Sequence, residues 1–306
     1  MNSKSKKFQY LVKEWGENYP PKAEMISQIQ KITPPQNKNT SKAIIWQVFG
    51  SLDSLFFKVF SYSILSHLKW SNILNFEVLV YISPCYMEEH RSIFEALKLL
   101  GIKFIQVKDI YPSKYFILRD KMPYEKLLLI DADIFIINKL DMNLYFNTEL
   151  HMSNDKPSIE QINSWAIWSP ELVRVKTGME ATDYFNLIWE YFEKLMSKEE
   201  FDEKLNYMEW INSGHCYLDE KLLKDENFIN FLRFSAINKI KSDEITLLMA
   251  TRLLKYTTGY NKVETAVNPT HSEEIYSKIN YPIHLNGLTF DKNTAFVNLF
   301  QKILND

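Results

Sequence analysis

Short apolar runs recur along the first half of the chain and predict buried strands. Three of them end before a polar or glycine-containing stretch, and a fourth runs directly into Asp131. Runs of this length, bounded by turn residues, are typical of strands that are covered on both faces of a sheet. The predicted strands span residues 43–49, 77–82, 102–107 and 126–130.

Helical spacing of apolar residues separates these strands. Residues 55–70 form one such stretch, and residues 84–100 form another that stops at Gly101, a residue type common just after a helix. Strands that alternate with helices of this length predict an α/β fold with a mostly parallel central sheet flanked by helices. In such sheets ligands bind outside the carboxyl ends of the strands.

The rest of the chain is less regular. Residues 1–42 read as an N-terminal helical appendage that ends in the polar linker 34–42, and residues 43–306 read as the main domain. In the second half the pattern predicts aromatic helices around residues 181–196, a strand at 211–218 and a helix at 243–256.

Composition narrows the possible classes of protein. The chain has 306 residues, of which 46% are apolar, and a formal net charge of −2. This balance indicates an ordered globular protein with no overall attraction for nucleic acid, so we expect no nucleic acid partner. Two cysteines, no signal-peptide pattern and no apolar run of transmembrane length favour a cytoplasmic protein without a transmembrane segment.

Asp131 and Asp133 interrupt an apolar run, and this position suggests a metal site. If the backbone is extended there, side chains two residues apart point to the same side, so both carboxylates meet at one place. Hard oxygen ligands of this kind suit Mg²⁺ or Mn²⁺. A bare Asp-x-Asp also arises by chance roughly once in a chain of this length. The context argues against chance, because ionised aspartates at the mouth of a buried strand are costly unless they are paired or bind a cation.

The stretch at residues 113–140, SKYFILRDKMPYEKLLLIDADIFIINKL, resembles the Asp-x-Asp region of GT-A fold glycosyltransferases, particularly the glycogenin-like and galactosyltransferase-like members of family 8. Three further segments resemble that family in the same order: INSGHCYL at 211–218, SDEITLLM at 242–249 and IHLNG at 283–287. The resemblance is patchy and spans about residues 43–292. It implies a GT-A nucleotide-binding fold and hexose transfer from a nucleotide diphosphate sugar.

The resemblance also implies a metal-ligand set. It makes His284 the third protein ligand, beside Asp131 and Asp133, to Mn²⁺ (or Mg²⁺). A mixed set of imidazole and carboxylate ligands agrees with manganese. A histidine met alone is more often structural.

Two basic residues precede the Asp-x-Asp segment where related enzymes contact the nucleotide sugar. The resemblance implies donor binding by Lys114 and a catalytic role for Arg119, whose forked donors suit phosphate or sugar oxygens. Alternatively, both residues lie on a solvated helix face.

The family pattern further implies two groups of residues beside the reacting sugar. Asn212 and Asp243 are the implied catalytic residues, and Ser213 and Gly214 are implied to bind the donor. Gly214 can instead simply permit a bend, and Asp243 can be a helix cap. Glu244 stands where the family commonly has glutamine.

The remaining donor-binding candidates are of two kinds. The end of the first strand is where such folds meet the nucleoside, although a turn or cap explains the same residues. At the C-terminal motif, Phe290 stands where the family has a lysine. Lys292 can substitute for that lysine only if the loop bulges. These candidates are Gly50, Ser51, Asp53, Gly287 and Lys292.

The sequence therefore predicts a metal-dependent glycosyltransferase that moves a hexose, with retention implied by the resemblance, from a UDP-sugar to an unidentified hydroxyl acceptor. One alternative is a phosphatase of the haloacid dehalogenase type, with Asp131 as nucleophile. Two features oppose it: three predicted β-α units precede the motif, and the large residues Ile134 and Phe135 follow Asp133 where such phosphatases usually have small turn residues. A sugar-nucleotide pyrophosphorylase would need a glycine-rich loop, which GSLDSLF lacks. An inactive carbohydrate-binding homologue is the non-enzyme alternative.

Overall fold

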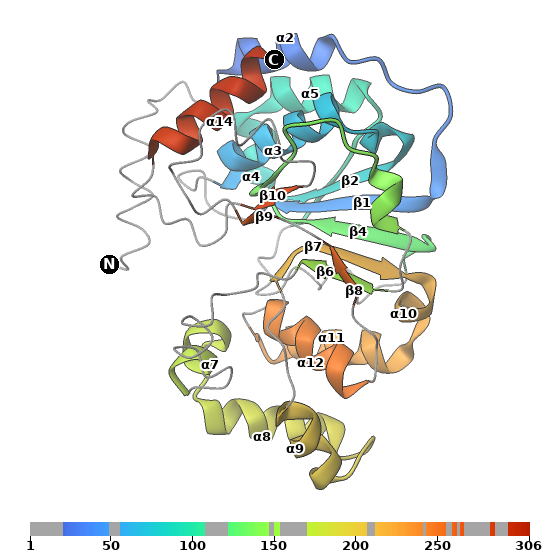
Figure 1. Cartoon of the computed structure of the whole chain (residues 1–306), viewed down its shortest axis with the longest axis vertical. Coiled ribbons are helices and arrows are strands. Elements are labelled where there is room, and N and C mark those ends of the chain that lie inside the picture. Colours follow the sequence, from blue (N-terminus) through green and yellow to red (C-terminus); the bar gives the residue numbers. More distant parts are fainter. Residues whose placement is uncertain are drawn as a thin grey trace. The chain divides into compact units, whose positions relative to one another are not determined.

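The computed structural model describes eleven parts of the chain, and these fall into two units (Figure 1). The described residues are 21–48, 56–107, 122–146, 150–153, 170–206, 212–240, 243–254, 259–261, 264–265, 282–284 and 293–306. Unit 1 comprises Met1–Ile110, Leu127–Phe146 and Lys262–Asp306, and unit 2 comprises Tyr111–Lys126 and Asn147–Asn261.

The sheet of unit 1 carries the four predicted apolar runs. Its strand order is β3-β2-β1-β4, and both β1–β2 and β2–β3 are parallel. Along β1 the residues Ala43, Ile44, Ile45 and Trp46 are all buried, as expected for a strand that is covered on both faces. The predicted α/β fold with a mostly parallel sheet is confirmed. The strands are β1 (Asn39–Val48), β2 (Phe76–Ile82), β3 (Lys103–Gln106) and β4 (Lys126–Ile130).

Helices of unit 1 pack on one another beside this sheet (Figure 1). Helix α3 contacts β1, α2 contacts both α3 and α5, and α14 contacts α2 and α3. The C-terminal helix is thereby part of the same layer as the first helices of the chain. These helices are α2 (Lys22–Gln30), α3 (Phe56–Trp70), α4 (Pro84–Glu89), α5 (Arg91–Leu99) and α14 (Asn293–Asn305).

Two predictions for unit 1 need correction. The helix predicted over 84–100 is broken at His90, whose backbone leaves the helical region while its ring stacks on Phe57 with 3.9 Å between centroids. Strand β1 begins at Asn39, inside the stretch predicted as linker. The predicted stop at Gly101 is confirmed: its φ of +80° suits glycine, and its N–H donates to Lys98 C=O at 2.8 Å.

Unit 2 combines a small mixed sheet with a helical layer. The strand order is β7-β6-β8, in which β6–β7 is antiparallel and β6–β8 is parallel. The helices and the strand predicted from the second half of the chain are present. The elements are β6 (Leu150–Ser153), α7 (Pro170–Thr177), α8 (Ala181–Phe192), α9 (Lys198–Asn206), β7 (Asn212–Asp219), α10 (Glu220–Lys224), α11 (Glu226–Ile237), α12 (Asp243–Leu253) and β8 (Gly259–Asn261).

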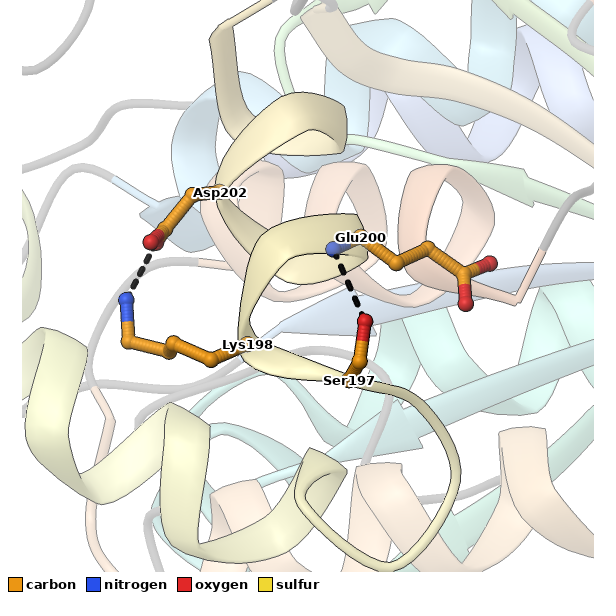
Figure 2. Close-up of polar contacts among 4 residues, drawn as sticks. All are labelled: Ser197, Lys198, Glu200 and Asp202. Atoms are coloured by element: carbon orange, nitrogen blue, oxygen red, sulfur yellow. Dashed lines mark hydrogen bonds and ion pairs between the residues drawn. The ribbon is translucent and has the colours of Figure 1, made fainter.

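Local sequence signals account for the start of α9 (Figure 2). Ser197 precedes the helix, and its Oγ accepts a hydrogen bond from Glu200 N–H at 3.2 Å. A serine with a glutamate three residues later is a common helix-start pattern, because the side chain satisfies a backbone N–H that has no partner inside the helix. The Lys198 ammonium, in the first residue of the helix, pairs with the Asp202 carboxylate one turn further along.

Among the described residues, none of the helices combines the length and the apolar character that crossing a membrane requires.

Candidate active site

Asp131 and Asp133 lie in a tight turn at the end of β4. The strand ends at Ile130, Ala132 and Asp133 form the turn, and Ile134 N–H donates to Asp131 C=O at 3.2 Å. The extended backbone predicted for this segment is therefore wrong. The two carboxylates still belong to one four-residue turn, a unit in which the chain folds back within about 7 Å. Both side chains are half-buried.

A second ladder brings His284 to this turn from the far end of the sequence. Strand β5 (Ile134–Phe135) pairs antiparallel with β10 (Ile283–His284), and His284 stands opposite Ile134. Strand β10 also pairs in parallel with β9 (Glu264–Thr265). Directly opposed residues in antiparallel strands have Cα atoms about 4.5–5.5 Å apart. The backbone of His284 thus lies beside the residue that follows Asp133.

Two buried serines of helix α3 hold the segment after the turn. The Ser63 hydroxyl donates to Ile134 C=O. The Ser66 Oγ accepts a hydrogen bond from Ile136 N–H at 3.1 Å and donates to Ser63 C=O at 2.7 Å. Both serine side chains are fully buried. Because a buried backbone group without a partner is costly, these hydroxyls fix the position of β5 and of the turn before it.

Further contacts tie the same segment to the end of α3. Leu140 N–H donates to Trp70 C=O at 2.7 Å. The Asn72 side chain donates to Asp141 Oδ1 at 2.7 Å and accepts from Met142 N–H at 2.7 Å. The pKa of Asp141 is lowered, first by the hydrogen bond from Asn143 N–H and then by that from Asn72. Residues 134–142 are therefore anchored at both ends.

Helix α14 packs against β5, the strand that follows the turn. Phe300 stacks on Tyr62 of α3 with 4.1 Å between ring centroids, and its ring centroid lies 5.7 Å from that of Phe135 in β5. The Lys69 ammonium donates to Ile303 C=O at 2.8 Å. Side chains of α3 and α14 thus pack together, and Phe300 of α14 also contacts β5, the strand that follows the turn.

The predicted residues of unit 2 lie on elements that contact each other. Asn212, Ser213 and Gly214 begin β7, Asp243 begins α12, and α12 packs against β7. The ladder between β6 and β7 is irregular here: Met152 pairs with Cys216, whereas Ser153 pairs with Asn212. One step along β6 therefore matches four residues along β7. Irregularities of this kind re-aim side chains and occur often near active sites.

Seven predicted site residues lie outside the described residues. They are Gly50, Ser51, Asp53, Lys114, Arg119, Gly287 and Lys292.

No group of three or more His, Cys, Asp or Glu side chains that could hold a metal occurs in the part of the chain whose side chains are described. The structure describes only the backbone of His284, so its side chain is not included in that statement. Asp131, Asp133 and His284 all belong to unit 1.

Sequence reasoning missed the supporting residues Ser63, Ser66, Asn72 and Asp141. Two polar residues three positions apart within the apolar helix FFKVFSYSILSHLKW were the available signal for the serines. Hydroxyls on a buried helix face need acceptors, and the helix itself satisfies only part of that need.

No protein-family model matches the sequence, and no curated protein matches it. Among solved structures, the chain is similar to the galactosyltransferase LgtC, solved with donor and acceptor sugar analogues, at 12% identity and a TM-score of 0.49, covering 86% of this chain and 95% of that one. It is also similar to the glycosyltransferase GlyE of Streptococcus pneumoniae (12%, TM-score 0.48, 87% and 63% covered) and to mouse xyloside xylosyltransferase 1 (9%, 0.46, 82% and 99%).

Proposed function

We propose that this protein is a glycosyltransferase that moves a hexose from a nucleotide diphosphate donor, a UDP-sugar, to a hydroxyl of an acceptor. The register of β5 with β10 carries this proposal, because it sets His284 opposite the residue that follows Asp133. The backbone of His284, which is distant from Asp131 and Asp133 in sequence, then lies beside the turn that carries them. This juxtaposition of two segments that resemble the family separately supports the proposal.

The residues present fit a divalent cation. Asp131 and Asp133 offer carboxylate oxygens within one turn, and both are half-buried, a position in which an ionised carboxylate gains from a bound cation. His284 would add a nitrogen ligand, a combination that manganese accepts. A bound Mn²⁺ or Mg²⁺ would neutralise the charge of the diphosphate leaving group.

The remaining chemistry falls to the chain's own residues. In the transfer, the bond between the sugar and the diphosphate breaks and the nucleoside diphosphate leaves with its electron pair. The acceptor oxygen forms the new bond to the sugar, and the proton of the acceptor hydroxyl is released to solvent. We assign sugar contacts to Asn212 and Asp243, donor contacts to Ser213 and Gly214, and donor phosphate or sugar contacts to Lys114 and Arg119. Gly50, Ser51 and Asp53 would meet the nucleoside, and Gly287 and Lys292 the diphosphate. Retention of configuration follows from the family resemblance.

Hydrolysis of UDP-sugars with Mn²⁺ tests the proposal, because slow transfer to water needs no known acceptor. We expect hydrolysis of at least one UDP-hexose, its loss in EDTA, and a decrease of more than about 100-fold in Asp131→Asn or Asp133→Asn, since groups that merely support metal ligands are already worth about 10–100-fold. Asp183→Asn is the matched control, because Asp183 is an exposed carboxylate in the first turn of α8.

Three results would contradict the proposal. Full turnover in excess chelator would exclude the metal role. A phosphate covalently attached to Asp131 would identify the phosphatase alternative. Failure to bind any sugar nucleotide in the presence of Mn²⁺ would leave an inactive carbohydrate-binding homologue.

A further inference from the structure

Unit 2 contains a cavity of about 520 Å³, and none of its described lining residues is a predicted site residue. It lies between residues just before β4, the end of α10 and one face of α11. Ligand-binding pockets in proteins commonly measure roughly 300–1,000 Å³. The cavity is therefore large enough for one or two sugar rings.

The lining from α11 follows the helical repeat. Glu226, Ile229, Asn230 and Arg233 are spaced so that they share one face of the helix. The opposite face, with Phe228 and Phe231 among its residues, is buried in the core of unit 2. The cavity face is thus held rigidly by the packing behind it, which favours ligand binding because little order has to be gained.

Part of the lining is apolar or aromatic. Met122, Tyr124, Leu223 and Ile229 are half-buried lining residues. An aromatic ring with a polar hydroxyl suits a ligand that has both an apolar and a polar side. A pyranose has this character, since its ring C–H groups form flat apolar faces and its hydroxyls form a polar edge.

The polar lining supplies both hydrogen-bond donors and acceptors. The Arg233 guanidinium donates through Nη1 to Asn230 Oδ1 at 3.1 Å, a contact that orients both side chains. Arg233 and Lys224 provide donors, and Glu226 provides carboxylate acceptors. Sugar hydroxyls donate and accept at the same time, so they can use a lining of mixed type.

The described residues of the lining carry charges of both signs, from Lys224, Arg233 and Glu226. The Lys224 ammonium is already paired with the Glu220 carboxylate one helical turn earlier. These described residues therefore offer little uncompensated charge to a phosphate or carboxylate group. We propose that this cavity is a binding site for a neutral saccharide. The site does not depend on the proposed transfer reaction.

Saturation-transfer NMR with the whole protein tests this site, using glucose, galactose, N-acetylglucosamine, maltose and lactose as probes. EDTA is present and nucleotide is absent, so the metal site makes no contribution. We expect saturable binding of at least one neutral sugar. Its Kd should rise about tenfold in Tyr124→Ala and about tenfold or more in Arg233→Ala, because each change removes a ring contact or charge-assisted hydrogen bonds.

Two variants serve as controls. Tyr124→Phe keeps the ring and should lose less affinity than Tyr124→Ala. Arg91→Ala removes an exposed arginine of α5 and should leave the Kd unchanged. The site is refuted if none of the neutral probes binds, if the correctly folded Tyr124 and Arg233 variants bind as tightly as the parent, or if only glucose 6-phosphate and glucuronate bind.

Discussion

The turn that carries Asp131 and Asp133 is held by hydrogen bonds, whereas helices α8, α9 and α11 of unit 2 are held by packed aromatic rings. Ser63 and Ser66 contact the backbone at Ile134 and Ile136. In unit 2, Phe192 and Phe231 lie with 5.0 Å between ring centroids, and Phe192 and Phe201 with 6.3 Å.

The difference separates position from stability. Hydrogen bonds are directional, so the serine contacts and the β5–β10 ladder fix the backbone that follows the two aspartates. Aromatic burial contributes more free energy but tolerates small shifts of the rings. We therefore expect changes in the aromatic cluster to lower stability and leave metal affinity intact, while changes around the turn affect metal affinity.

The largest expected effect is in the aromatic cluster. Phe231 is fully buried, and its ring centroid lies 5.2 Å from that of Tyr191. Phe231→Ala should lower the free energy of unfolding by about 3–5 kcal/mol, because it removes buried apolar surface and leaves a cavity. Urea denaturation measures this loss. Ile237→Ala on the same helix should cost within about 0.5 kcal/mol, because Ile237 is 78% exposed. A parallel loss of Mn²⁺ affinity in folded Phe231→Ala would break the comparison.

Stability should depend on pH through His67 of α3. The side chain is buried, its ring edge meets Trp46, and its Nδ1 lies 2.8 Å from Ser63 C=O. Burial lowers the pKa of His67 from 6.5 to about 4. The unfolded chain therefore binds the extra proton first, and stability falls as pH drops from about 6.5 to about 4, by on the order of 3 kcal/mol.

Urea denaturation between pH 7 and pH 4 measures this contribution in the parent and in His67→Leu. The unfolding free energy of the parent, taken relative to that of His67→Leu, should fall by that amount toward pH 4 and level off below it. A difference that stays constant across this range would show that His67 keeps its ordinary pKa in the folded protein.

His284→Ala should weaken Mn²⁺ binding by about 10–100-fold or more, judged from the scale for residues that support metal ligands. Electron paramagnetic resonance with UDP present measures the affinity. Thr265→Ala is the matched control, because Thr265 pairs with His284 from the other side of β10. Unchanged affinity in folded His284→Ala would remove His284 from the site and leave Asp131 and Asp133 as the remaining candidates.

The smallest expected effect is in the serines. Ser66→Ala leaves the buried Ile136 N–H without its acceptor and should lower the unfolding free energy by about 1–3 kcal/mol. Mn²⁺ affinity should fall a few-fold as the turn loses support. Ser61→Ala is a sharp control, because Ser61 is buried in the same helix but donates only to Phe57 C=O of its own helix. If both variants change Mn²⁺ affinity equally, the serine contacts to the turn have no special role.

Much of the fold could be predicted from the sequence alone. The apolar runs that became β1, β2, β3 and β4 are read from neighbouring residues, because burial of both faces demands continuous apolar sequence. The stop at Gly101 is equally local, since only the residue type decides whether a positive φ is cheap. Asp131 and Asp133 could be proposed as metal ligands from the sequence, because two carboxylates after an apolar strand are costly without a cation.

Only the tertiary structure decided how these residues meet. The turn at Ala132 and Asp133 replaced the expected extended backbone, and the break at His90 accompanies stacking on Phe57. Strands as short as β5 and β10 show no periodicity, so their pairing could not be read from either segment alone. Local sequence specifies local conformation, whereas the position of His284 beside the turn depends on contacts between segments that are distant along the chain.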